Sequence, residues 1–96
     1  MQIFLDTADC QVIQSHLGTG LIDGVTTNPS LIMKSGRNPD DVYTELKNMG
    51  VEDISMEVVD PSAAGMVAEG FRLADFYGDC CTIKVPCTKD GLQACN

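Results

Sequence analysis

Short apolar runs alternate with amphipathic segments along the whole chain, and this alternation restricts the fold more than any other feature. Runs at residues 3–5, 21–25, 53–59 and 80–85 have the length and apolar content of buried strands. Each run is followed by a segment with helix start signals or with helical spacing of its apolar residues. Strands that alternate with helices are typical of a parallel sheet with right-handed crossovers. The sequence therefore predicts an α/β fold.

Capping residues and glycines mark the expected helices. Val42, Leu46 and Met49 lie at i, i+4 and i+7, so they predict the buried stripe of the third helix. The expected helix starts are Asp9, Asn28, Asn38, Asp60 and Thr88. The expected ends of the first four helices are Leu17, Gly36, Gly50 and Gly78.

After the fourth predicted strand, the sequence contains only the first turn or so of the helix that would cover it. Parallel sheets bury both faces, and an unpaired edge strand favours association. We therefore expect residues 1–96 to form a single partial domain that is truncated relative to a complete fold. The alternative is a homo-oligomer in which several copies cover the exposed sheet.

The charge balance disfavours several classes of partner. Six basic against fourteen acidic residues give a net charge of −8. Such a chain repels nucleic acid and anionic membrane surfaces, and a phosphorylated substrate would need a local cluster of donors. No apolar stretch approaches the ~20 residues of a membrane helix. The first residues lack the basic segment of a secretory signal, so we expect a cytoplasmic location.

The five cysteines suggest neither a disulfide framework nor a zinc site. Their number is odd, no C-x-x-C occurs, and His16 is the only histidine. We expect reduced and mostly buried thiols, with Cys95 as an exposed exception, and no bound metal. We expect His16 to have a surface or packing role.

A polar residue stands at the carboxyl end of each predicted strand. These residues are Asp6, then Thr26 with Asn28, then Glu57, then Lys84. Active sites of parallel α/β folds gather at this rim. Convergence of all four strand ends therefore predicts a site there.

Lys84 is the candidate nucleophile because it lies within an apolar strand. Burial of an ammonium group is costly, so we expect its pKa to fall and the neutral amine to become available for imine formation. The alternative is a structural ion pair with Glu57 or Asp6.

The other rim residues each have two interpretations. Asp6 is either a proton acceptor for a substrate hydroxyl or a helix cap, whereas Asp9 is expected to be a cap. Glu57 activates a water molecule or only balances the charge of Lys84. Asn28 hydrogen-bonds substrate hydroxyls or caps a helix, and Thr26 beside it is a further candidate for substrate binding.

Several segments together resemble the small transaldolases. The most specific are Thr26-Thr27-Asn28-Pro29-Ser30 and Ile83-Lys84-Val85-Pro86, and the likeness extends in order over essentially the whole chain. The matching segments are residues 5–9, 24–32, 57–59, 65–70 and 83–86, with Thr88, Gly91 and Leu92.

The resemblance implies the N-terminal half of a (β/α)8 TIM barrel, whose usual size is ~250 residues. It implies that Lys84 forms a Schiff base with a ketose phosphate and that Asp6 handles the proton of the C4 hydroxyl. Asn28 would hold the dihydroxyacetone moiety, and Glu57 would activate the water used in forming and hydrolysing the imine. The imine is the electron sink, so no cofactor or metal is expected.

Three alternatives to transaldolase activity stay open. Fructose-6-phosphate aldolases resemble the chain equally well but carry glutamine where Glu57 stands, which favours transaldolase. A receiver-like regulatory domain would need adjacent acids and a lysine directly before proline, whereas Val85 separates Lys84 from Pro86. The family's phosphate-binding arginine and serines come from later strands, so the 96 residues could also be a non-catalytic fragment.

Overall fold

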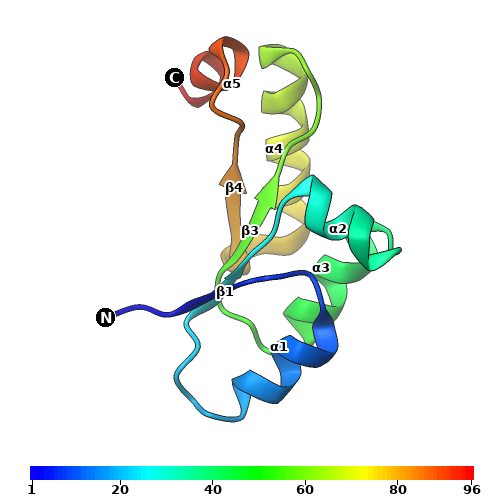
Figure 1. Ribbon diagram of the computed structural model, residues 1–96. Helices are drawn as coiled ribbons and strands as arrows, with labels where there is room; N and C mark the ends of the chain where they lie inside the picture. The colour runs from blue at the N-terminus through cyan, green and yellow to red at the C-terminus, as the bar shows by residue number, and fades with distance from the viewer.

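The computed structural model describes residues 1–96 and contains one four-stranded parallel sheet, so the predicted α/β class is confirmed (Figure 1). The strands are β1 (Phe4–Asp6), β2 (Gly24–Thr26), β3 (Ile54–Glu57) and β4 (Cys81–Lys84). The helices are α1 (Cys10–Leu17), α2 (Pro29–Ser35), α3 (Pro39–Asn48), α4 (Ala63–Tyr77), the short 3-10 helix η1 (Gly78–Cys80) and α5 (Lys89–Cys95).

The strands lie side by side across the sheet in the order β1-β2-β3-β4, and every neighbouring pair is parallel. Receiver-like folds have the order 2-1-3-4-5, with the first strand inside the sheet. The sequential order instead is that of four successive strands of a (β/α)8 barrel. The strand direction turns strongly from β1 to β4 in Figure 1, as the twist and tilt of barrel strands require.

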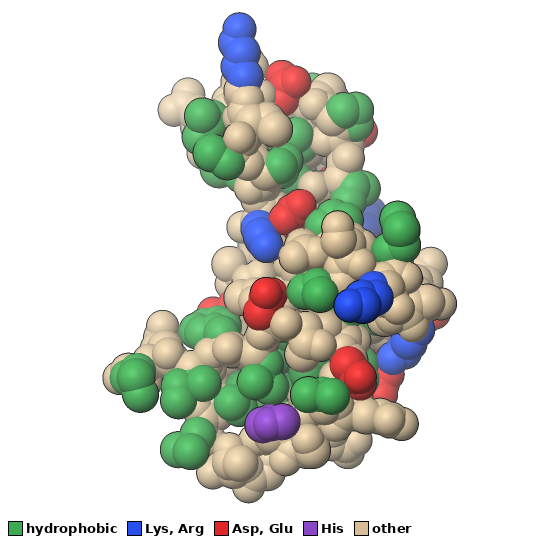
Figure 2. Space-filling view, in the orientation of Figure 1, with side chains coloured by type: hydrophobic (Ala, Val, Ile, Leu, Met, Phe, Trp, Pro, Cys, Tyr) green, Lys and Arg blue, Asp and Glu red, His purple; other side chains and the backbone are tan.

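The two faces of the sheet differ in polarity because side chains alternate along each strand. Ile54, Met56 and Val58 are fully buried beneath the helices, whereas Ser55 and Glu57 belong to the opposite face. This alternation confirms the pattern expected for the third strand. We call the second face the open face, since no helix covers it (Figure 1). Figure 2 shows the molecule hollowed between its α4–α5 end and its α1 end.

The core lies between the sheet and helices α1 to α4. Val42 and Leu46 are fully buried as predicted, and Tyr43 beside them is a core residue that the predicted stripe omitted. Its ring meets that of Tyr77 edge to face, with 5.7 Å between the ring centres. None of the helices combines the length and the apolar character that spanning a bilayer requires.

Several predicted boundaries were wrong, although β1 and β4 differ from the prediction by only one residue at each end. Residues 21–23 are not part of β2, and Leu21 is 65% exposed. β3 is shorter than predicted and ends at Glu57. α4 begins at Ala63 because the Ser62 hydroxyl accepts a hydrogen bond from the Gly65 N–H at 3.0 Å and so forms the cap.

The cysteines are more exposed than predicted. All five are free, but only Cys10 is buried, while Cys80 and Cys81 are half-buried. Cys87 and Cys95 are exposed, which confirms the expectation for Cys95. The prediction of mostly buried thiols was wrong because four of the five lie between η1 and the end of α5, along the edge strand β4 and the segments that flank it.

The last helix is longer than the single turn expected from the sequence. α5 spans seven residues and begins at the predicted cap, Thr88, whose hydroxyl accepts from the Gly91 N–H at 3.0 Å. A Cβ at position 91 would collide with the carbonyl oxygen of Pro86. Glycine therefore lets the helix start pack directly on the chain that leaves β4.

A buried tyrosine hydrogen bond connects α3 to α4. The Tyr77 hydroxyl donates to Asp40 Oδ1 at 2.6 Å, and Arg72 lies 3.5 Å from the same carboxylate oxygen. Burial, together with the bond to Asp40, raises the pKa of Tyr77 from its usual value of 10 to about 12. The native state thus favours the protonated phenol, and this contribution to stability is present below pH 10 and lost as the pH rises through 12.

We predict that Tyr77→Phe lowers the free energy of unfolding by about 1.5 kcal/mol at pH 7, since a hydrogen bond to a carboxylate is lost. The difference should shrink between pH 10 and pH 12. Urea denaturation across this pH range measures both effects. Asp40→Asn is the matched control, because it keeps an acceptor oxygen and should cost less. Equal stabilities of Tyr77→Phe and the parent at pH 7 would contradict the prediction.

Candidate active site

The last residues of the four strands are four of the five predicted rim residues, Asp6, Thr26, Glu57 and Lys84. The strand register makes Asp6 a neighbour of Thr26 and makes Glu57 a neighbour of Lys84. In-register neighbours of parallel strands direct their side chains to the same face. The sheet therefore brings these side chains together at its carboxyl end, on the open face.

Lys84 contacts two acceptors. Its Nζ lies 3.5 Å from Glu57 Oε1 and donates to the main-chain oxygen of Thr27 at 3.2 Å. The ion pair that the sequence left open is therefore with Glu57. The Lys84 side chain is 40% exposed and that of Glu57 is 17% exposed. Lys84 is therefore half-buried, whereas the sequence predicted a buried amine. The reason is that nothing within these residues covers the open face. A pair this exposed contributes little to stability.

Asp6 and Thr26 form a second polar pair on the same face. The Thr26 hydroxyl donates to Asp6 Oδ1 at 2.9 Å, across the β1–β2 pairing. Asp6 is not the cap of α1, because the Asp9 carboxylate accepts from the N–H groups of Gln11 and Val12. Capping by Asp9 is thus confirmed. The Asp6 carboxylate faces the open side of the sheet with one hydroxyl donor fixed on it.

Asn28 does cap a helix, as one of its two interpretations stated. Its Oδ1 accepts from the Leu31 N–H at 2.9 Å at the start of α2. The cap occupies the oxygen only, so the side-chain NH2 group remains available as a donor. Capping and substrate binding are therefore compatible for this residue.

Thr27 is the polar residue that sequence reasoning missed. It is fully buried, and its hydroxyl donates to the main-chain oxygen of Ser55 at 2.9 Å. Burial raises the pKa of the adjacent Tyr43 phenol, and the Thr27 side chain opposes part of that rise. The contact of Thr27 with Lys84 uses a carbonyl group, which every residue has. No side-chain pattern could have predicted it.

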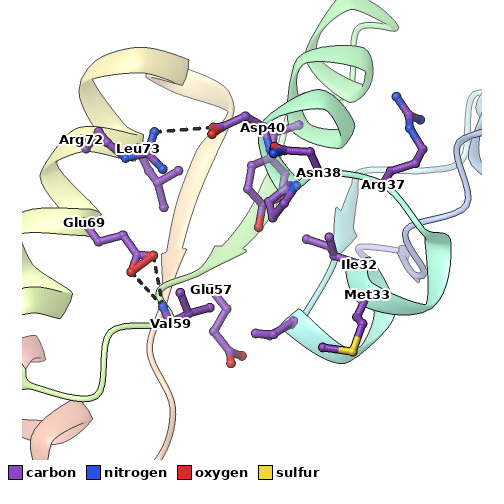
Figure 3. Close-up of a pocket in the computed structure, with 13 residues that line it drawn as sticks. Ile32, Met33, Arg37, Asn38, Asp40, Glu57, Val59, Glu69, Arg72 and Leu73 are labelled. Carbon is purple, nitrogen blue, oxygen red and sulfur yellow. Dashed lines mark hydrogen bonds and ion pairs between the residues drawn. The ribbon is translucent and has the colours of Figure 1, made fainter.

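A cavity of about 390 Å³ lies beside this rim, between α2, α3 and α4 (Figure 3). Of the predicted site residues only Glu57 lines it, and Figure 3 shows its carboxylate directed away from Arg72 and Asp40. The charged groups of the cavity are occupied within the protein. Glu69 accepts from the N–H groups of Val59 and Asp60, and Arg72 pairs with Asp40. The rim on the open face, and not this cavity, is therefore the candidate site.

The rim groups suit amine and acid–base chemistry. Lys84 offers a primary amine, Glu57 a carboxylate 3.5 Å from it, and Asp6 a second carboxylate two strands further along the sheet. An amine nucleophile with an adjacent carboxylate is an arrangement that can form an imine with a carbonyl compound. No three His, Cys, Asp or Glu side chains gather closely enough to hold a metal ion. His16 is exposed on α1, away from these groups.

Comparison with known proteins agrees with the geometry. The family model described as transaldolase/fructose-6-phosphate aldolase matches residues 3–96. The chain is 50% identical over 95 residues to a probable transaldolase of Nitrosopumilus maritimus and 50% identical to one of Caulobacter vibrioides. It is 48% identical to a probable transaldolase of Geobacter sulfurreducens.

Each of these matches covers 99% of this chain but only 42 to 44% of the relative. The chain thus spans less than half the length of the curated relatives that it matches. The family match itself extends over nearly every residue. The chain therefore belongs to the transaldolase/fructose-6-phosphate aldolase family.

Proposed function

We propose that this chain carries the Schiff-base half of a transaldolase, which transfers a dihydroxyacetone unit between sugar phosphates in the pentose phosphate pathway. The observation that supports it most is the contact between Lys84 Nζ and Glu57 Oε1, 3.5 Å apart at the carboxyl ends of adjacent strands. A structural ion pair alone would not need Asp6 and Thr26 on the same face. Transaldolase chemistry needs an amine and two carboxylates there.

The reaction begins when the neutral amine of Lys84 attacks the C2 ketone of a ketose phosphate. Glu57 takes the proton of the Lys84 ammonium, which makes the amine neutral, and then gives this proton to the hydroxyl of the resulting carbinolamine, so that water leaves and the iminium forms. Asp6 accepts the proton of the C4 hydroxyl, and the C3–C4 bond breaks. The electron pair of that bond enters the iminium, which becomes a dihydroxyacetone enamine on Lys84, and an aldose phosphate is released.

Transfer is completed by the reverse sequence with a second aldose phosphate. The enamine carbon attacks the acceptor aldehyde, and Asp6 returns its proton to the new hydroxyl. Glu57 then activates a water molecule that hydrolyses the imine. The Asn28 NH2 group and Thr26 hold hydroxyls of the dihydroxyacetone part. A carboxylate rather than an amide at position 57 favours transfer over simple aldol cleavage.

We propose a cytoplasmic location, since the proposed substrates are sugar phosphates. We also propose that copies of the protein associate. β1 and β4 each have only one neighbouring strand, and free edges of this kind promote pairing.

We predict that Lys84 is the lysine on which borohydride traps an adduct in the presence of dihydroxyacetone or a ketose phosphate. Its amine lies at the rim beside Glu57, whereas Lys34, Lys47 and Lys89 are all exposed on helices. Peptide mass spectrometry locates the adduct. Lys84→Ala should abolish it, and Lys89→Ala is the matched control that should leave it unchanged. An adduct mainly on another lysine would refute the assignment.

We predict that Glu57→Gln lowers transaldolase turnover by about 100-fold, because loss of a general base commonly costs about 10²–10⁴-fold. The measurement requires a chain of the relatives' full length that contains this sequence. Asp53→Asn, on the same face at the opposite end of β3, is the control and should retain activity. Turnover of Glu57→Gln within a few-fold of the parent would show that Glu57 is not the base. A gain of aldol cleavage in Glu57→Gln would support the view that glutamine at this position is typical of fructose-6-phosphate aldolases.

We predict that residues 1–96 alone show no appreciable turnover of fructose 6-phosphate with erythrose 4-phosphate. Lys84 is 40% exposed on the open face, so water weakens the interaction of its amine with the adjacent Glu57 carboxylate. The net charge of −8 also repels the anionic substrates. A coupled assay on the purified monomer tests this, with size-exclusion chromatography to establish its state. Turnover by a monomer would mean that four strands complete the site.

A further inference from the structure

Lys84 reaches across its neighbouring strand. It starts at the end of β4, passes β3, and donates to the main-chain oxygen of Thr27, the residue directly after β2. The same Nζ atom also lies 3.5 Å from Glu57 Oε1, at the end of β3. The amine of Lys84 is therefore held between two acceptors that come from two different strand ends.

Two acceptors decide where the lone pair of a neutral amine points. A neutral primary amine has two N–H bonds and one lone pair, arranged roughly tetrahedrally about nitrogen. If the N–H bonds are directed at the Thr27 oxygen and the Glu57 carboxylate, the lone pair takes the remaining direction. With only one acceptor, the amine could rotate about its Cε–Nζ bond and direct the lone pair elsewhere.

The Thr27 carbonyl is itself fixed by the Thr27 side chain. Backbone pairing of β2 with β3 ends at Thr26 and Ser55, so Thr27 lies just beyond the ladder. Its fully buried hydroxyl donates to the Ser55 oxygen at 2.9 Å and continues the link between the two strands. Asn28 then begins the cap of α2. The hydroxyl is thus the last side-chain link to β3 before the chain turns away.

We infer that Thr27 is a positioning residue for the nucleophile: its buried hydroxyl holds its carbonyl where Lys84 needs an acceptor. This inference rests on the proposed imine chemistry of Lys84 and adds a residue to it. Thr27 touches no substrate and acts only through the direction of the amine. Misplacement of a reacting group by about 1 Å can cost about 100-fold in rate, so loss of the hydroxyl should slow imine formation.

The test is the rate at which dihydroxyacetone is trapped on Lys84 by excess cyanoborohydride, measured over a range of dihydroxyacetone concentrations. In the full 96-residue chain, Thr27→Val should lower the maximal trapping rate at least about tenfold. The half-saturating concentration should stay within about twofold, because substrate contacts are retained. Thr27→Ser restores the hydroxyl and should recover most of the rate.

Thr82→Val is the matched control. It removes another threonine hydroxyl bond, to Asp53 at 2.6 Å, from the same strand as Lys84, and it should trap at the parent rate. A folded Thr27→Val with the parent's maximal rate, or a Thr27→Ser as slow as Thr27→Val, would overturn the inference. If circular dichroism shows Thr27→Val unfolded, Thr27→Ala is measured by the same criteria.

A second measurement does not depend on any Thr27 variant or on trapping. Lys84→Met keeps an unbranched side chain that ends one atom short of Nζ and so removes the donor, and the carbonyl carbon of Thr27 should therefore change its NMR chemical shift more than that of Ser55. An unchanged Thr27 carbonyl would overturn the inference. Absence of a Lys84 adduct in the parent would instead refute the proposed imine chemistry, and the NMR result would still decide whether Thr27 holds the amine.

Discussion

Parallel pairing of the four strands in sequential order is the constraint on which the rest of the structure depends. It aligns Asp6 with Thr26 and Glu57 with Lys84, although long stretches of chain separate them. The same order sends each crossover helix to one side of the sheet. A single topological feature therefore concentrates the candidate site residues at one rim and leaves one face open.

The open face explains why the candidate site residues are only partly removed from water. The helix side of the sheet has fully buried residues such as Val25, Ile54 and Met56. The opposite side has only other side chains of the sheet as cover, so Lys84 keeps 40% of its exposure. In a closed eight-stranded barrel, facing strands fill this space with side chains. Enclosure of Lys84 is thus a property of the complete barrel and not of any one strand.

Much of the fold and of the candidate site could be predicted from local sequence. The helix caps at Asp9, Asn28 and Thr88 were predicted correctly, since a cap depends on a side chain and the few residues after it. The rim residues were predicted because a strand end and a polar side chain are both visible in sequence. The predicted start of α4 was wrong because two possible capping residues lie close together. The sequence predicted Asp60 as the cap, but Ser62, two residues later, provides it.

The sequence by itself determined the α/β class, the apolar periodicity and the polar residues near the four strand ends, because each depends on neighbouring residues along the chain. Tertiary structure alone decided which of these groups meet. The partner of Lys84 could have been Asp6 or Glu57, and strand register selected Glu57. The second acceptor, the Thr27 carbonyl, has no signature in sequence, since a backbone oxygen becomes specific only through its position in space.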